Sequence, residues 1–266
     1  KRDPPVAELY VVGSDQVWNP YISFDKAYYL LFGDKSIKRA SYAASIGVSE
    51  INDNFKEDFI NRIACVEYKS VREKDAQRLL MSYGIDAEVH IDPTLLLTSE
   101  QYDEIAIQPN FGEKYVLLYL LILPEDYKKY VNEVRNIYPD AVIVNIPGKT
   151  SSPAIGDIEM GDIGPKEFLG LIKNAEAVVT SSFHGTVFSI IYKKQFMSII
   201  PHDTGKRISD LLDRFGLNNR ITKEAIDISA INNKIHYDKV TEKLNISREQ
   251  AKKYLQKITN GNENKL

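Results

Sequence analysis

Short runs of apolar, β-branched residues alternate along the chain with longer segments in which apolar residues recur every three or four positions. The short runs predict buried strands and the longer segments predict amphipathic helices. In the first part of the chain this pattern predicts strands over 8–12, 39–46, 67–71 and 87–91, with helices over 55–66 and 73–84. Repeated alternation of this kind favours parallel sheets.

A second series of the same kind follows a polar connection over residues 95–114. Its predicted strands are 114–122, 141–146, 177–180 and 195–200, and its predicted helices are 125–139, 165–175, 183–194 and 207–216. Residues 147–164 are rich in Gly, Ser and Pro and predict a loop of a length that is often functional. The polar tail beyond residue 222 is predicted to be helical.

Two strand–helix series joined by a connector predict an α/β fold with two Rossmann-like domains, parallel sheets and a cleft between them. We expect an N-terminal domain over 1–110, a C-terminal domain over 111–222 and a helical tail over 223–266. The chain opens on KRDPPVAELY and has no initiating methionine. We therefore expect the N-terminal domain to be incomplete in this sequence.

Composition narrows the classes of function. The chain has 266 residues, of which 43% are hydrophobic and 27% charged, as in an ordinary globular protein. A net charge of -3 gives no basic excess for a nucleic-acid partner. The lone cysteine, Cys65, leaves no internal disulfide, and no Cys/His spacing is typical of zinc, so we predict no metal site.

Polar and small residues collect directly after the predicted strands. The strand-following segments are Gly13–Gln16, Arg72–Glu73, Asp92–Thr94, Ser181–Gly185 and His202–Asp203. Ligands of open α/β sheets bind at the carboxyl ends of strands, so this bias favours a binding cleft. The alternative is that these residues only form turns and helix caps.

Two of these segments predict anion binding. Ser70 and Glu73 have the spacing of a capping box, which places Arg72 in the first turn of a helix, where a cation opposes the helix dipole unless it binds an anion. In Ser181–Gly185, either serine can cap the next helix, whose first N–H groups favour an anion. Gly185 would let a ligand approach closely. The alternatives are a solvated Arg72 and a buried His184 bonded to a carbonyl.

The segment GSDQVWNP after the first strand contains the single tryptophan of the chain. Asp15 is either a general base or a cap, and Trp18 either stacks on a sugar ring or fills the core. His202 and Asp203 either face the cleft or form a turn.

Six segments, in order, resemble the polysaccharide pyruvyl transferase family: YVVGSDQVWNP, RASYAASIG, SVREKDAQRLL, HIDPTLLL, GPKEFLGLIKNAEAVVTSSFHGTVFSIIYKKQF and RISDLLDRFGL. The resemblance implies a GT-B-like fold and a bacterial, cytoplasmic enzyme of exopolysaccharide biosynthesis. It implies transfer of a pyruvyl group from phosphoenolpyruvate, as co-substrate, to a pair of sugar hydroxyls, giving a pyruvate ketal without a metal or other cofactor. A lipid-linked acceptor would bring the protein to the inner face of the membrane.

Roles for individual residues follow from this resemblance and from the chemistry of a small anionic donor. We expect His184 and Asp15 to be catalytic, as acid or phosphate ligand and as base. The expected donor-binding residues are Arg72, Ser181, Ser182, Gly185 and Arg207. The expected acceptor-binding residues are Ser14, Gln16 and Trp18.

Two other functions remain open at this stage. One is a GT-B glycosyltransferase that takes a nucleotide sugar, and the other is a glycan-binding relative without catalysis. Family members often carry an arginine two residues before the histidine, where this chain has Ser182. That substitution favours the non-catalytic function.

Overall fold

The computed structural model describes residues 4–149, 151–200, 206–222 and 228–260. It divides into two compact units, which are residues 1–96 with 242–266 (unit 1) and residues 97–241 (unit 2). The first division lies inside the polar connection expected over 95–114. The expected limit near residue 110 lies within unit 2, and the expected limit near residue 222 differs because most of the C-terminal helix packs on unit 1.

Unit 1 is built on four short parallel strands that follow the order of the chain. β1 (Leu9–Val12) pairs with β2 (Lys38–Ser41), and β3 (Ser70–Val71) pairs with β4 (Glu88–Val89). The strand expected over 39–46 is shorter because Ala43 adopts a φ of 48°, which an extended strand cannot accommodate.

Serine hydroxyls join β2 to β3, where the two strands form only isolated bridges. The N–H of Ser70 donates to Ser41 Oγ at 2.8 Å, and the N–H of Ala43 donates to Ser70 Oγ at 3.1 Å. These side chains satisfy buried backbone donors that a regular ladder would otherwise pair.

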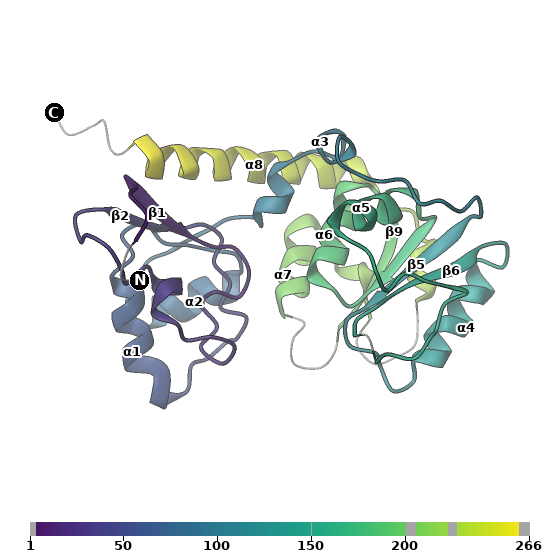
Figure 1. Cartoon of the computed structure of the whole chain (residues 1–266), viewed down its shortest axis with the longest axis horizontal. Helices are drawn as coiled ribbons and strands as arrows, with labels where there is room; N and C mark the ends of the chain where they lie inside the picture. The colour runs from purple at the N-terminus through teal and green to yellow at the C-terminus, as the bar shows by residue number, and fades with distance from the viewer. Residues whose placement is uncertain (1–3, 150, 201–205, 223–227, 261–266) are drawn as a thin grey trace. The chain divides into compact units, whose positions relative to one another are not determined.

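Helices cover both faces of these strands. The apolar side chains of α1 (Asp53–Ala64) and α2 (Lys74–Ser82) join one core cluster with β1. On the other side lies α8 (Tyr237–Asn260), whose Tyr254 hydroxyl donates to Ser41 O at 2.8 Å (Figure 1). Two short 3-10 helices complete the unit, η1 (Lys26–Tyr29) and η2 (Pro93–Leu96).

Unit 2 contains a six-stranded parallel sheet in the order β10-β9-β8-β5-β6-β7. The strands are β5 (Tyr115–Leu120), β6 (Val142–Pro147), β7 (Ile158–Glu159), β8 (Ala177–Thr180), β9 (Gln195–Ile199) and β10 (Ile221–Thr222). The helices are α3 (Ser99–Asp103), α4 (Tyr127–Ile137), α5 (Pro165–Asn174), α6 (Phe183–Ile191), α7 (Lys206–Phe215), η3 (Asn218–Arg220) and η4 (Ser229–Asn232). Parallel strands alternating with helices confirm the α/β class.

Alternate residues of β5 face opposite layers of helices, as the period of two requires. Val116 and Leu118 lie in the cluster that includes Val134 of α4. On the opposite face the hydroxyl of Tyr115 donates to Leu171 O of α5 at 2.7 Å. Figure 1 shows α4 on one side of this sheet and α5 and α6 on the other.

The expected loop over 147–164 contains β7, which is too short to leave a pattern in the sequence. The carboxylate of Glu159 accepts from the N–H groups of Ile155 and Gly156, each at 2.7 Å, and from Asn145 Nδ2 at 2.7 Å. The second half of the loop is therefore held against the sheet. Among the described residues, no helix has both the length and the apolar character that crossing a membrane requires.

Candidate active site

The strand order of unit 2 defines a topological switch point. From β5 the sheet continues through β6 on one side and through β8 on the other, so the loops after β5 and β8 diverge at their carboxyl ends. Ligands of doubly wound sheets bind in this crevice. The Ser181–Gly185 segment follows β8 directly and therefore lies at the switch point of unit 2.

Ser182, one of the two serines expected as possible caps, is the N-cap of α6. Its Oγ accepts from the N–H of Gly185 at 3.2 Å, and its own N–H donates to Thr180 Oγ1 at 3.0 Å. Ser181 joins the two diverging loops because its Oγ accepts from the N–H of Ile122 at 3.4 Å. His184 lies half-buried in the first turn of α6, with its ring edge-on to Phe183.

Gly185 is explained by packing within unit 2. A Cβ at this position would lie 2.4 Å from Thr180 Oγ1, which donates to Tyr119 O and accepts from the N–H of Ser182. The missing side chain thus lets α6 start close against β8. This packing accounts for glycine at position 185 without the close approach of a ligand. A role for Gly185 in donor binding remains a proposal.

Replacing Gly185 with alanine is expected to destabilise the protein by about 1–3 kcal/mol, the usual cost of overpacking. The better helix propensity of alanine, about 1 kcal/mol, offsets only part of the strain. Urea unfolding followed by circular dichroism measures the change. Gly112→Ala is the matched control because a Cβ added at Gly112 would have no neighbour within 4 Å. Equal stability of the two variants would contradict this account of Gly185.

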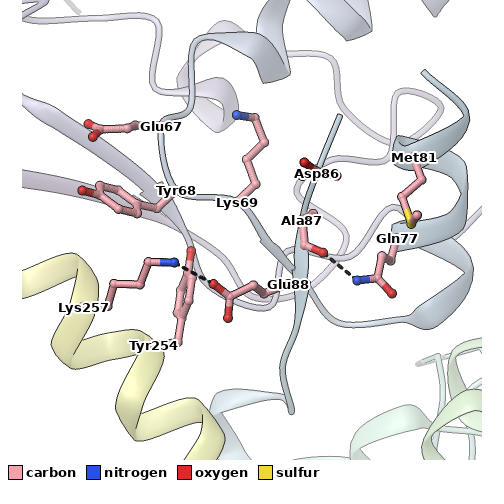
Figure 2. A pocket seen from close by; sticks show the side chains of 10 residues that line it. All are labelled: Glu67, Tyr68, Lys69, Gln77, Met81, Asp86, Ala87, Glu88, Tyr254 and Lys257. Carbon is pink, nitrogen blue, oxygen red and sulfur yellow. Dashed lines mark hydrogen bonds and ion pairs between the residues drawn. The ribbon is translucent and has the colours of Figure 1, made fainter. Parts of the chain in front are cut away.

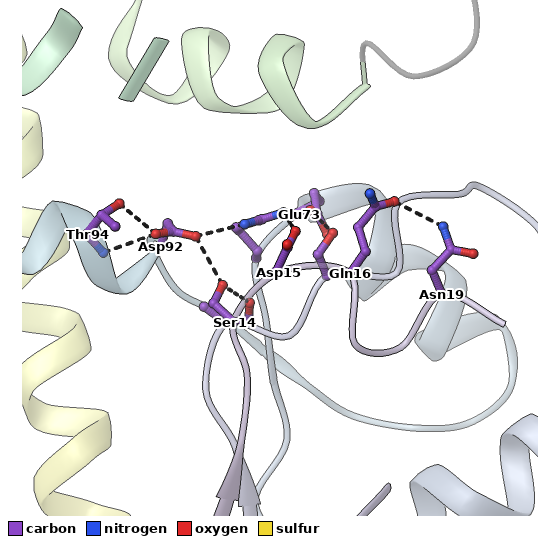
Figure 3. A network of polar contacts seen from close by, with 10 residues as sticks. Ser14, Asp15, Gln16, Asn19, Glu73, Asp92 and Thr94 are labelled. Carbon is purple, nitrogen blue, oxygen red and sulfur yellow. Dashed lines mark hydrogen bonds and ion pairs between the residues drawn. The ribbon is translucent and has the colours of Figure 1, made fainter. Parts of the chain in front are cut away.

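The second group of polar side chains lies where β1, β3 and β4 of unit 1 end (Figure 3). The guanidinium of Arg72 contacts three carboxylates: Nη1 lies 2.7 Å from Asp92 Oδ2, Nε lies 3.2 Å from Glu73 Oε1, and Nη2 lies 3.7 Å from Asp15 Oδ1. The side chain of Arg72 is 3% exposed and that of Asp15 is 69% exposed. We call Ser14, Asp15, Ser45, Arg72, Glu73, Asp92 and Thr94 the Arg72 network.

Asp92 is bonded at both of its carboxylate oxygens. Its Oδ1 accepts from the N–H of Thr94 at 3.0 Å and from Thr94 Oγ1 at 2.6 Å. Burial by itself raises the pKa of this carboxyl, but the charge of Arg72 and the hydrogen bonds from Thr94 and Arg72 hold the pKa below its ordinary value. Asp92 is therefore ionised at neutral pH.

The expected capping box at Ser70 and Glu73 is wrong. Glu73 itself is the N-cap of α2 and makes no side-chain cap bond, and Ser70 Oγ accepts from the N–H of Ala43. Glu73 Oε1 instead accepts from Ser45 Oγ at 2.5 Å. Arg72 consequently lies between β3 and α2, paired with carboxylates, and does not occupy the first turn of a helix.

The loop after β1 has an unusual backbone that brings Asp15 to this edge. Asp15 adopts a φ of 47°, and its carbonyl accepts from the N–H of Ser45 at 2.8 Å. Gly13 has a φ of 135°, and a Cβ there would lie 2.0 Å from Tyr42 O, so the tight turn requires glycine. Residues held in sparsely populated conformations often mark functional sites.

The two other expected acceptor residues of this loop differ in position. Gln16 is half-buried, and its Oε1 accepts from Asn19 Nδ2 at 3.0 Å. Trp18 is fully buried, donates from Nε1 to Tyr28 O at 3.1 Å and stacks on Tyr29. The expected contact of Trp18 with an acceptor is therefore corrected, because its ring belongs to the core of unit 1.

Arg207, the remaining expected donor residue, lies half-buried in the first turn of α7. His202 and Asp203 lie outside the described residues. Within the part of the chain that the structure describes, no group of three or more His, Cys, Asp or Glu side chains is arranged to hold a metal ion.

A pocket of about 370 Å³ lies at the opposite end of the unit 1 strands (Figure 2). Its lining includes Tyr68 and Lys69 before β3, Ala87 before β4, and Tyr254 and Lys257 of α8. These positions are at the amino ends of the strands, whereas the Arg72 network is at the carboxyl ends. The pocket is thus separate from the candidate active site of unit 1.

The sequence placed Glu73, Asp92 and Thr94 after strands, but Glu73 was expected only in a capping box, Asp92 and Thr94 were assigned no role, and Ser45 was missed. The positions of Glu73, Asp92 and Thr94 directly after strands could have indicated that they lie together, because parallel strands present their carboxyl ends at one edge of a sheet. Nothing local marks Ser45, whose partner Glu73 is 28 residues away in the chain.

The fold defines the structural class of the protein. Among solved structures, the chain is similar to a UDP-GlcNAc 2-epimerase from Methanocaldococcus jannaschii in complex with UDP-GlcNAc and UDP, with a TM-score of 0.51, 15% identity and coverage of 96% of this chain and 76% of that one. It is also similar to a putative UDP-N-acetylglucosamine 2-epimerase from Listeria monocytogenes, with a TM-score of 0.60, 12% identity and coverage of 94% and 74%. These likenesses show a GT-B-like fold.

The family follows from the sequence itself. Residues 2–203 match the family model described as polysaccharide pyruvyl transferase. The chain belongs to the polysaccharide pyruvyl transferase family, as its six motifs predict. A search of curated proteins gave no significant match.

Proposed function

We propose that this protein transfers a pyruvyl group from phosphoenolpyruvate to a pair of hydroxyls on a sugar or lipid-linked glycan, giving a pyruvate ketal and phosphate. The match of residues 2–203 to the family is the observation that carries the proposal. We place the reaction in the cytoplasm, at the inner face of the membrane when the acceptor is lipid-linked. No metal or other cofactor takes part in the proposed chemistry.

The proposed reaction begins with protonation of the donor's methylene carbon, which leaves an oxocarbenium-like centre at the adjacent carbon. One sugar hydroxyl forms a bond to that centre and loses its proton to a base. The carbon–oxygen bond to phosphate then breaks, and the second hydroxyl closes the ketal. Of the two hydroxyl protons, one replaces the proton that the methylene carbon received and the other leaves with phosphate.

Residues of unit 2 are assigned to the donor. The Ser181–Gly185 segment lies at a switch point and begins a helix, where N–H groups and the helix dipole favour a phosphate. His184 in that first turn is assigned as acid or phosphate ligand. Arg207 is assigned to the donor anion, because a guanidinium bonds carboxylate and phosphate strongly.

Residues of the Arg72 network are assigned to the donor and the acceptor. Arg72 is assigned to the donor anion, with its orientation set by the carboxylates around it. Asp15 is the assigned base because its carboxylate is 69% exposed and can accept a proton from a hydroxyl. Ser14 and Gln16 are assigned to the acceptor.

A thermal-shift comparison with phosphoenolpyruvate, UDP-GlcNAc and inorganic phosphate is expected to show stabilisation by phosphoenolpyruvate. A ligand at about 100 times its Kd adds about 2.7 kcal/mol to stability, which raises Tm by several degrees in a protein of this size. Phosphate release with an acceptor panel then measures turnover. No shift with phosphoenolpyruvate would overturn the proposal.

The second candidate function is transfer from a nucleotide sugar. It is favoured by the similar epimerase structures, which include complexes with UDP-GlcNAc. A shift with UDP-GlcNAc and none with phosphoenolpyruvate would select it. A shift with neither ligand, together with binding of a glycan, would select the non-catalytic function.

A further inference from the structure

One carboxylate of the Arg72 network contacts residues assigned to both substrates. Asp92 Oδ2 accepts from Arg72 Nη1 at 2.7 Å and lies 3.1 Å from Ser14 Oγ, whose hydroxyl also lies 2.7 Å from Ala43 O. Figure 3 shows Asp92 between Thr94 and Ser14. Arg72 belongs to the donor side of the proposed reaction and Ser14 to the acceptor side.

Asp92 is itself held in place. The two hydrogen bonds from Thr94 occupy Oδ1, and Arg72 Nη1 donates to Oδ2, where the single proton of the Ser14 hydroxyl is shared between Asp92 and Ala43 O. The residue is 2% exposed. This arrangement fixes the geometry of the groups that the carboxylate bonds.

We propose that Asp92 is a positioning residue that orients both the Arg72 guanidinium and the Ser14 hydroxyl, and thereby couples donor binding to acceptor binding. The proposal rests on the proposed function for the roles of Arg72 and Ser14. Arg72 donates to Asp92 from Nη1 and to Glu73 from Nε, so a shift of the Asp92 carboxylate releases one of the bonds that orient the planar guanidinium.

Asp92→Asn tests the coupling. The amide keeps the size of the side chain but replaces one oxygen with an N–H donor that faces either Arg72 or Thr94. We expect KM for phosphoenolpyruvate and KM for the acceptor both to rise, with kcat/KM falling about 100-fold, as expected when a substrate-positioning group shifts. Arg72→Lys is expected to raise mainly KM for phosphoenolpyruvate, and Ser14→Ala is expected to raise mainly KM for the acceptor.

Asp75→Asn is the matched control. Asp75 lies in α2 of the same unit and pairs with Arg78, whose side chain is 69% exposed. The substitution removes the same charge from an Asp–Arg pair at the surface, so we expect unchanged kcat/KM, with only a small fall in Tm because Asp75 also lies in the first turn of α2. A rise in one KM alone for Asp92→Asn, or equal effects of the two variants, would overturn the coupling.

A spectroscopic measurement separates this inference from the proposed function. In the full chain labelled with ¹⁵N-arginine, the guanidinium resonances of Arg72 are identified by their loss in Arg72→Lys. Asp92→Asn is expected to shift them and to speed guanidinium rotation, whether or not phosphoenolpyruvate is a substrate. If the resonances shift in Asp92→Asn but the wild-type protein shows no turnover of phosphoenolpyruvate, the proposed function is overturned and the orientation of Arg72 by Asp92 stands. If the resonances do not change, the inference is overturned.

Thr94→Val keeps the test decisive if Asp92→Asn does not fold. The variant leaves Asp92 ionised but removes the 2.6 Å bond from Thr94 Oγ1 that fixes its carboxylate. We expect both KM values to rise in the same pattern by a smaller factor. Two unchanged KM values in a folded Thr94→Val protein would contradict the positioning role.

Discussion

Replacing His184 with alanine is expected to lower turnover about 100- to 10,000-fold, the usual range for loss of a general acid or base. His184 lies in the first turn of α6, at the switch point between β5 and β8, where the proposed donor phosphate would sit. An imidazole in that position can give a proton to the methylene carbon or hold the phosphate as it leaves.

The fold should survive this change. His184 is half-buried, and neither the cap bond of Ser182 nor the close contact at Gly185 depends on its ring. We expect the free energy of unfolding to fall by about 1 kcal/mol, a typical value for a single substitution. The measurement is phosphate release from phosphoenolpyruvate with acceptor present, alongside Tm.

His236→Ala is the matched control for His184→Ala. His236 is exposed and directly precedes α8, so its loss is expected to leave turnover and Tm as in the wild type. Unchanged turnover in His184→Ala would remove His184 from the mechanism. Equal losses in both variants would indicate a nonspecific effect of the substitution.

Trp18→Ala is expected to destabilise unit 1 by about 3–5 kcal/mol, the range for truncating a large buried aromatic side chain. The ring is fully buried, stacks on Tyr29 and donates a hydrogen bond to Tyr28 O. Natural domains have about 5–15 kcal/mol of stability, so this loss is a large share of it. Urea unfolding followed by circular dichroism measures it.

Trp18→Phe separates packing from acceptor binding. Phenylalanine keeps most of the buried ring but cannot donate to Tyr28 O, so we expect an intermediate loss of stability. KM for the acceptor should stay unchanged at a temperature where the variant is folded. A higher KM at full stability would return Trp18 to the acceptor site.

Local patterns predicted most elements of the fold, including the strand and the helix that flank the Ser181–Gly185 segment. The strand β8 and the capping of α6 by Ser182 follow from a β-branched run and from a serine before an apolar helix, both of which act over a few residues. The strand-end positions of Arg72 and Asp15 were likewise predictable. Their association with Asp92 was not, since it depends on which strands are neighbours.

Other features escaped because they depend on distant contacts or on single backbone angles. The shortening of β2 depends on the positive φ of Ala43, which the conformational preferences of alanine do not predict. Ser70 has the right spacing for a capping box, but the chain uses its hydroxyl to join β2 and β3. A tryptophan ring can either fill a core or stack on a sugar, and the sequence does not distinguish the two. The burial of Trp18 in the structure decides between them.

The two units differ in when they can be completed during synthesis. Unit 2 is one continuous stretch, 97–241, whereas unit 1 needs residues 242–260 to cover a face that includes Tyr42 and His90. Tyr254, which packs on both rings, emerges from the ribosome only after the whole of unit 2. Because domains generally fold as units and N-terminal segments emerge first, unit 2 can fold while unit 1 still exposes this aromatic face to chaperones.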